Sequence, residues 1–240
     1  MRTVTVVVPV LDELRVLPET IARLRALAPP PDGVVFCDGG STDGSRELLE
    51  KHVDGASMFM VQAPRGRGLQ MNAGAALAAT DIVLFLHADA WLPRDAIARV
   101  AAALDDDRVA GGAFTIAFAR ESRSPRSMPL IAAGINARTR ATRTATGDQA
   151  IFATRKAFDR LEGFKPWPLF EDVDFVTRLK RVGRFVVLSG PVVLSDRRYA
   201  QMGPWRTTLR MWWLRVRYWL GHSPDDLKRA FVDVRRSHEE

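Results

Sequence analysis

Acidic residues follow three apolar runs in the first half of the sequence. Asp12 and Glu13 come after the first run, Asp38 opens the turn Asp38-Gly39-Gly40-Ser41-Thr42-Asp43 after the second, and Asp89 ends His87-Ala88-Asp89 after a third. Carboxylates that are brought together repel unless a cation or the hydroxyl groups of a ligand engage them. The turn alone also fits a helix N-cap. Three acidic clusters at one sheet edge would instead predict a ligand or metal site.

A further acidic pair, Glu171-Asp172, precedes apolar residues at helical spacing: Val173, Val176, Leu179 and Val182. Both carboxylates would then lie in the first turn of a helix. The positive end of a helix favours the ionised carboxylate, which is the form that a general base requires. The pair therefore fits a catalytic base, and it also fits simple helix capping.

The first half alternates apolar runs with amphipathic segments, which predicts a parallel sheet covered by helices on both faces. The continuous runs 4–8 and 82–86 are typical of central strands that are buried on both sides. Ligands bind beyond the carboxyl ends of such strands, where the acidic clusters fall. The expected strands are 3–8, 34–37, 58–61 and 82–86, and the expected helices are 17–28, 43–52, 69–79 and 94–104.

The second half is less regular, which predicts that the sheet continues with mixed topology. We expect strands at 109–119, 149–153, 185–188 and 191–195, a helix ending near 140, and a helix at 171–182.

The order of these motifs resembles the family 2 glycosyltransferases of the GT-A fold over nearly the whole chain. The resemblance implies an α/β protein with a Rossmann-like, doubly wound, mixed and mostly parallel sheet and a C-terminal helical segment. It divides the chain into a domain at 1–196, with a nucleotide-binding half at 1–90 and an acceptor half at 91–196, and C-terminal amphipathic helices at 197–240. The matching motifs are Val6-Val7-Val8-Pro9-Val10-Leu11-Asp12-Glu13, Cys37-Asp38-Gly39-Gly40-Ser41-Thr42-Asp43, Arg65-Gly66-Arg67-Gly68, Asn72-Ala73-Gly74, Phe85-Leu86-His87-Ala88-Asp89, Gly147-Asp148-Gln149, Gly163-Phe164 and Glu171-Asp172.

From this resemblance we expect a nucleotide diphosphate-sugar donor. Asp12, Glu13 and Asp38 would contact its base and ribose, and Arg67 would lie near the nucleotide. Arg65 and Arg67 also fit solvated loop charges. The full set of expected donor-binding residues is Pro9, Asp12, Glu13, Asp38, Gly40, Arg67, Asn72 and His87.

The resemblance also implies a divalent cation at an Asp-x-Asp motif, in which His87 here replaces the first aspartate. Asp89 would be the main ligand, because Mg²⁺ and Mn²⁺ prefer oxygen atoms and bridge a diphosphate. His87 would be a softer ligand that favours Mn²⁺, a hydrogen-bond donor to the donor substrate, or a histidine satisfied at a strand end.

In the family, the second residue of the Glu171-Asp172 pair removes the acceptor proton, so Asp172 is the expected base and Glu171 its neighbour. The reaction would be a hexosyl transfer by a single inverting displacement. A non-catalytic nucleotide-sugar-binding protein and a sugar nucleotidyltransferase are the alternatives. A nicotinamide-binding Rossmann enzyme is disfavoured, because no Gly-x-Gly-x-x-Gly follows the first strand.

Charge is unevenly distributed along the chain. Residues 1–120 hold 12 Lys/Arg against 15 Asp/Glu, and residues 121–240 hold 23 against 13. The acidic first half argues against nucleic-acid binding. Cys37 is the single cysteine, and no secretory signal or spanning stretch is visible, so we expect a cytoplasmic location.

The segment 205–220 predicts a helix that gathers Trp205, Leu209, Trp212, Trp213, Val216, Trp219 and Leu220 on one face. Arg206, Arg210 and Arg217 flank that face. The pattern fits a helix that lies on the anionic inner face of the membrane and meets a lipid-linked acceptor, and it also fits a helix that packs its Trp face on the domain.

Overall fold

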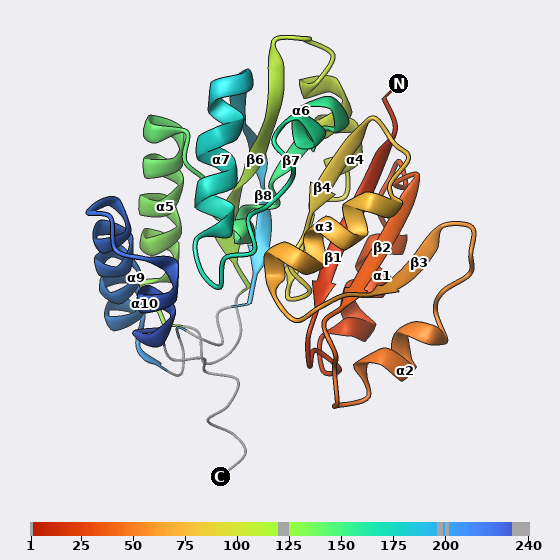
Figure 1. Cartoon of the computed structure of the whole chain (residues 1–240), viewed down its shortest axis with the longest axis horizontal. Coiled ribbons are helices and arrows are strands. Elements are labelled where there is room, and N and C mark those ends of the chain that lie inside the picture. The colour runs from red at the N-terminus through yellow and green to blue at the C-terminus, as the bar shows by residue number, and fades with distance from the viewer. Residues whose placement is uncertain (1, 120–124, 196–198, 200–201, 232–240) are drawn as a thin grey trace.

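An eight-stranded mixed sheet runs through the chain, with strand order β3-β2-β1-β4-β7-β6-β8-β5 (Figure 1). The structure is a computed structural model and describes residues 2–119, 125–195, 199 and 202–231. Strands β1 to β4 pair in parallel, whereas β7 pairs antiparallel to both β4 and β6. Their bounds are β1 Val4–Val10, β2 Gly33–Asp38, β3 Met58–Gln62, β4 Ile82–Phe85, β5 Ala90–Trp91, β6 Val109–Phe118, β7 Phe152–Thr154 and β8 Arg184–Leu194.

Strand β1 occupies the centre of the parallel part of the sheet, as its continuous valine run predicts. It pairs with β2 on one side and β4 on the other, so that Val6 lies opposite both Val34 and Leu84. Helix α3 (Arg67–Leu77) crosses β1 and β2 closely at Gly74. A Cβ atom at Gly74 would lie 2.4 Å from the Cys37 sulfur and 2.5 Å from Val7. Glycine at position 74 allows α3 to pack closely on the sheet.

Apolar side chains fill both sides of the sheet, which gives three layers. One side packs against α1 (Leu17–Arg25), α2 (Ser45–Glu50), α4 (Ala96–Ala103) and part of α5 (Met128–Thr142). The other side packs against α3, α6 (Arg155–Arg160) and α7 (Glu171–Val182). Four phenylalanines, Phe85, Phe158, Phe164 and Phe175, stack together on this second side and fix α7 against β4.

The second half carries the mixed topology that was predicted, with one correction. Residues 184–194 form one strand, β8, and not the two separate strands expected at 185–188 and 191–195. Strand β8 pairs in parallel with β6 from Val109 to Phe118, and register shifts accommodate the Ser189-Gly190-Pro191 segment without ending the strand. The short elements β5 and α6 were not predicted.

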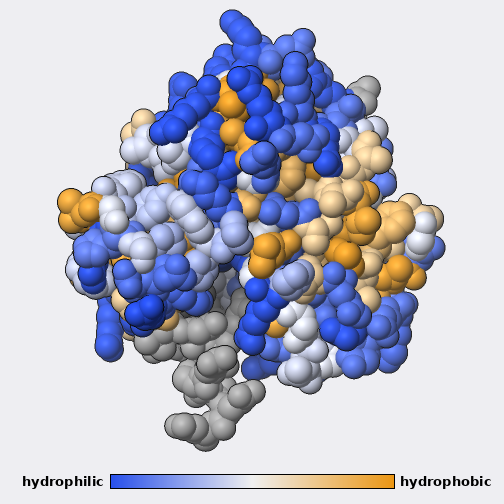
Figure 2. All heavy atoms as spheres, in the orientation of Figure 1, coloured by the Kyte–Doolittle hydropathy of each residue, from blue (hydrophilic) through white to orange (hydrophobic). Residues whose placement is uncertain are grey.

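Two C-terminal helices, α9 (Pro204–Trp219) and α10 (Pro224–Arg229), pack beside α5 and the start of α7 (Figure 1). The inward residue Leu214 meets Phe170 and Val173 at the start of α7, and Leu227 of α10 completes this small core. The expected boundary at 196/197 lies outside the described residues. The surface around α6 and α7 is mainly hydrophilic, and apolar side chains gather at the edge formed by β3 (Figure 2).

Candidate active site

The loops that follow β1 and β2 are joined by hydrogen bonds to each other. Asp12 Oδ1 accepts from the Thr42 amide at 2.8 Å, and the Asp12 amide donates to Ser41 Oγ at 3.0 Å. The Glu13 amide donates to Ser45 Oγ at 2.9 Å. The first two acidic clusters therefore lie together at the carboxyl edge of the sheet, as predicted.

Asp38 is completely buried at the end of β2. Its carboxylate accepts hydrogen bonds from the amides of Gly40 and Ser41 and from the guanidinium of Arg46, the last at 2.8 Å. Burial raises the pKa of Asp38, but hydrogen bonds from Ser41 and Arg46 outweigh that effect and hold the pKa below its ordinary value. In this structure Asp38 shapes the turn, and its contact with a donor stays a prediction.

Two amide side chains of α3 fix the loops around the site. Gln70, which sequence reasoning missed, donates to the carbonyl groups of Val10 at 2.7 Å and Cys37 at 2.8 Å, and so ties the ends of β1 and β2 together beside Pro9. Asn72 forms two hydrogen bonds with the backbone of Phe164, at 2.8 and 2.9 Å. The structure thus gives Asn72 a loop-positioning contact, and its predicted donor contact remains untested.

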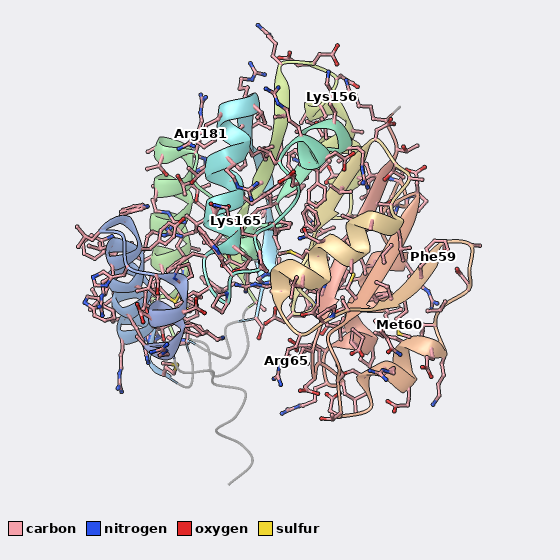
Figure 3. The ribbon with its side chains drawn as sticks, viewed as in Figure 1. Phe59, Met60, Arg65, Lys156, Lys165 and Arg181 are labelled. Atoms are coloured by element: carbon pink, nitrogen blue, oxygen red, sulfur yellow. The ribbon has the colours of Figure 1, made fainter. Side chains whose placement is uncertain are left out.

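Arg65 and Arg67 differ in their environments. Arg65 is exposed and points away from the sheet at the lower edge of the molecule (Figure 3). Arg67, at the start of α3, forms an ion pair with Glu171 at the start of α7. Burial lowers the pKa of Arg67, but the charges of Glu171 and Asp172 outweigh it and raise the pKa above its ordinary value. Arg65 is thus solvated, whereas Arg67, whose side chain is 38% exposed, is held by an ion pair with Glu171.

The first turn of α7 buries both acidic residues that were predicted to be catalytic. Asp172 is 6% exposed, and its Oδ2 accepts a hydrogen bond from the Gly147 amide at 2.7 Å, while Oδ1 accepts from the Val173 amide at 2.7 Å. Glu171 is 1% exposed. Its Oε2 atom has no hydrogen-bond partner in the part of the chain that the structure describes. A buried carboxylate oxygen without a partner is costly, and a ligand hydroxyl or cation would satisfy it.

The side chain of His87, which follows β4, lies close to Gly147 and Asp172. A Cβ atom at Gly147 would lie 2.8 Å from His87 Nε2 and 3.3 Å from Asp172 Oδ2. The imidazole and the Asp172 carboxylate therefore both border Gly147. The fold brings together the ends of β4 and the starts of α3 and α7, which are far apart in sequence.

Asp89 remains available as a metal ligand. Its carboxylate is half-buried, and neither a hydrogen bond nor an ion pair engages it among the described residues. No group of three or more His, Cys, Asp or Glu side chains within 2–119, 125–195, 199 and 202–231 is arranged to hold a metal by itself. One carboxylate completed by substrate phosphates is a common arrangement for Mg²⁺, so Asp89 fits a cation that arrives with a diphosphate.

Three more charged residues adjoin Asp172 and were missed as site residues. Asp148 lies in the 3-10 turn η1 (Gly147–Gln149), Arg138 on α5 and Arg215 on α9. Burial and the nearby charge of Asp172 raise the pKa of Asp148 against an opposing hydrogen bond from Thr146. No signal in the sequence marks Arg215, because only the packing of Leu214 shows that this face of α9 is the inward one.

These features place carboxylates, arginines and a histidine near one edge of the sheet, beyond the ends of the parallel strands. The sequence model of glycosyl transferase family 2 matches residues 5–161, which is more than half of the chain. The chain belongs to glycosyl transferase family 2. No curated protein sequence is similar enough to be matched.

Solved glycosyltransferase structures share the fold of this family 2 member. S. aureus TarS 1-349 in complex with UDP superposes with a TM-score of 0.64 at 20% identity, covering 80% of this chain and 60% of that one. The mannosyltransferase PcManGT from Pyrobaculum calidifontis, in complex with GDP-Man and Mn²⁺, superposes with a TM-score of 0.61 at 23% identity, covering 81% and 56%. The GT-A fold is thereby confirmed, and the chain spans about 60% of the length of these proteins.

Proposed function

We propose that this protein transfers a hexose from a nucleotide diphosphate-sugar to an acceptor hydroxyl. The observation that carries the proposal is the meeting of Arg67, Glu171, Asp172, Gly147 and His87 next to the strand-end loops. The complexes of TarS with UDP and of PcManGT with GDP-Man support a nucleotide-sugar donor. In this proposal the nucleotide-binding part of the site consists of Pro9, Asp12, Glu13, Asp38 and Gly40.

Asp172 acts as the general base in this proposal. Its carboxylate accepts the proton of the acceptor hydroxyl, the oxygen forms a bond to the anomeric carbon from one side, and the bond to the diphosphate breaks on the other. The electron pair leaves with the diphosphate, and the anomeric configuration inverts. The Gly147 and Val173 amides hold the carboxylate in place, which supports this role. The ion pair between Arg67 and Glu171 joins the start of α3 to the start of α7, next to Asp172.

Asp89, with His87 as its neighbour, would hold a divalent cation, Mn²⁺ or Mg²⁺. When bound, such a cation neutralises charge on the departing diphosphate. The assignment is supported by the half-buried carboxylate of Asp89, which has no hydrogen-bond or ion-pair partner among the described residues.

A donor screen tests the proposal. We expect UDP, GDP or their sugars, added with Mn²⁺, to raise the melting temperature of the wild-type protein, because a ligand of the native state stabilises it. Asp89→Ala is expected to abolish the Mn²⁺-dependent part of nucleoside diphosphate binding in calorimetry, whereas Asp95→Ala, an aspartate paired with Arg99 on α4, leaves it unchanged. Unchanged Mn²⁺ dependence in Asp89→Ala would contradict the metal assignment.

An activity assay that analyses the products formed from the sugar donor separates the alternatives. Release of nucleoside diphosphate from the sugar donor supports a transferase, formation of nucleoside triphosphate with pyrophosphate supports a nucleotidyltransferase, and binding without turnover supports a non-catalytic protein.

The C-terminal helix supports a location at the cytoplasmic face of an anionic membrane and a lipid-linked acceptor. No helix among the described residues combines the length and apolar character that crossing a bilayer requires. The Trp face predicted for α9 points outward into solvent. The alternative, in which this Trp face packs on the domain, is therefore wrong. Its large exposed residues are Trp205, Leu209, Trp212, Trp213, Trp219 and Leu220. Tryptophan beside arginine is typical of helices that rest on anionic lipid.

A further inference from the structure

Arg138 and Arg215 form a pair of sequestered positive charges beside the proposed base. Arg215 is only 6% exposed. Arg138 is half-buried, and its Nε atom is buried without a hydrogen-bond partner in the described chain. Within the described residues neither guanidinium has an ion-pair partner within 4.0 Å, in contrast to Arg67, which is paired with Glu171. A charge removed from water without a partner is costly to the fold, and proteins retain such charges mainly where a ligand completes them.

The two arginines also act on each other. Burial, followed by the charge of Arg215, lowers the pKa of Arg138 to about 10, although Asp148 and Asp172 partly oppose this. Burial likewise lowers the pKa of Arg215, against the attraction of Asp172 and Asp148. Of these two carboxylates, Asp172 accepts two backbone amides, whereas Asp148 keeps a buried Oδ1 atom without a hydrogen-bond partner among the described residues. Two like charges therefore act on each other, and neither has an ion-pair partner within 4.0 Å among the described residues.

The scaffold holds this pair on the acceptor side of the site. Asn136 ties α5 to β6 through both the amide and the carbonyl of Ile116, at 2.8 and 2.9 Å. Helix α9 packs on Phe170 and Val173 through Leu214, next to Arg215. Both helices lie across α7 from the nucleotide half, which contains β1 to β3 (Figure 1).

We propose that Arg138 and Arg215 bind an oxyanion of the acceptor, a phosphate or carboxylate group close to the hydroxyl that receives the sugar. This inference rests on the proposed function, because it assumes that Asp172 faces the acceptor. Two guanidinium groups offer several N–H donors in the planar arrangement that phosphate and carboxylate oxygens accept. The same oxyanion chemistry is present in the diphosphate of the donor, so the test must distinguish the two sources.

The experiment measures binding of inorganic phosphate to the whole protein by calorimetry at constant ionic strength, with and without saturating UDP and Mn²⁺. We expect phosphate to bind the wild type in both conditions. Arg138→Gln and Arg215→Gln should each weaken phosphate about tenfold or more and leave UDP affinity nearly unchanged, because each removes a charge-assisted contact. Arg140→Gln, an exposed arginine on the same helix, is the matched control and should behave as wild type.

Arg138→Lys and Arg215→Lys are the controls for misfolding. They keep the positive charge and should therefore retain part of the phosphate affinity. Competition between phosphate and UDP, with equal losses for both ligands in the variants, would assign the arginines to the donor diphosphate and overturn the inference. Equal phosphate binding by wild type and variants, or none by the wild type, would also overturn it. Failure of UDP and GDP to bind the wild type would count against the proposed function. The phosphate titrations without nucleotide would still test whether Arg138 and Arg215 bind an oxyanion.

Discussion

At the scale of single residues, the position of Asp172 predicts a separation of binding from chemistry. Asp172→Asn can still accept the Gly147 amide through its carbonyl oxygen, but it cannot take a proton. We expect nucleoside diphosphate affinity to change little and turnover to fall roughly 10²- to 10⁴-fold. Calorimetry and release of nucleoside diphosphate measure the two. Parallel losses of affinity and turnover would mean that Asp172 mainly supports the start of α7.

Gly147 sets the spacing between His87 and Asp172. A methyl group there would lie 2.8 Å from His87 Nε2 and 3.3 Å from Asp172 Oδ2, so both side chains must shift in Gly147→Ala. We expect a loss of about 1–3 kcal/mol in the free energy of unfolding, together with reduced turnover.

The control for this prediction is Gly134→Ala on α5, where a Cβ atom meets nothing within 4 Å. Alanine in an open helical position should raise the free energy of unfolding by about 0.5–1 kcal/mol. Urea denaturation of both variants tests the contrast. Wild-type turnover in Gly147→Ala would show that the site tolerates displacement of His87 and Asp172.

At the scale of elements, the outward face of α9 predicts membrane association without a role in stability. Trp212 and Trp219 are 63% and 60% exposed, so Trp212→Gln with Trp219→Gln should leave the melting temperature unchanged. We expect the double variant to lose co-sedimentation with anionic vesicles. Leu77→Gln on α3, at 55% exposure, is the matched control and should sediment as wild type does.

Salt provides the second arm of that experiment. Attraction between the arginines of α9 and anionic lipid weakens when the Debye length falls, to about 10 Å at 0.1 M salt. Binding should therefore decrease at high salt and be weak with neutral vesicles. A wild-type protein that stays in the supernatant with anionic vesicles at low salt would instead favour an acceptor free in solution.

At the scale of the whole molecule, hydrogen-bonded carboxylates predict loss of stability in acid. Among the described residues, six aspartates have a pKa below the ordinary value of 3.8: Asp38, Asp43, Asp54, Asp81, Asp95 and Asp106. Each contributes stability that is fully present above pH 3.8 and is lost as the pH falls through the lower folded pKa. Asp148, whose pKa is raised, acts in the opposite direction, because its contribution is present below pH 3.8 and is lost as the pH rises through its folded pKa.

Thermal unfolding should therefore show a melting temperature that falls as the pH drops below 3.8, since six groups outweigh one. Backbone amides of Met58, Ser57 and Ala56 and the Ser57 hydroxyl hold the pKa of Asp54 low, so Asp54→Asn should flatten the curve. Asp105→Asn, an exposed aspartate, serves as control. A melting temperature that stays constant or rises as the pH falls from 3.8 to about 2 would contradict the prediction.

The sequence by itself determined the sheet, the strand-end acidic clusters and the family. Continuous valine and isoleucine runs are stable only as strands covered on both faces, and parallel strands bring their carboxyl ends to one edge, so Asp12 and Asp38 had to lie together. The same local logic placed Glu171 and Asp172 in the first turn of a helix. Each of these conclusions follows from periodicity or motif order along a short stretch of chain.

Only the tertiary structure decided how distant side chains are paired. It turned Arg67 inward to Glu171 and left Arg65 in solvent, and it tied Asn72 to Phe164. Helix α9 shows the physical reason. Periodicity finds residues that share a face, but α9 has two faces with apolar residues, and the packing of Leu214 against Phe170 and Val173 decides which one is buried. This packing leaves the Trp face exposed and places Arg215 at the site.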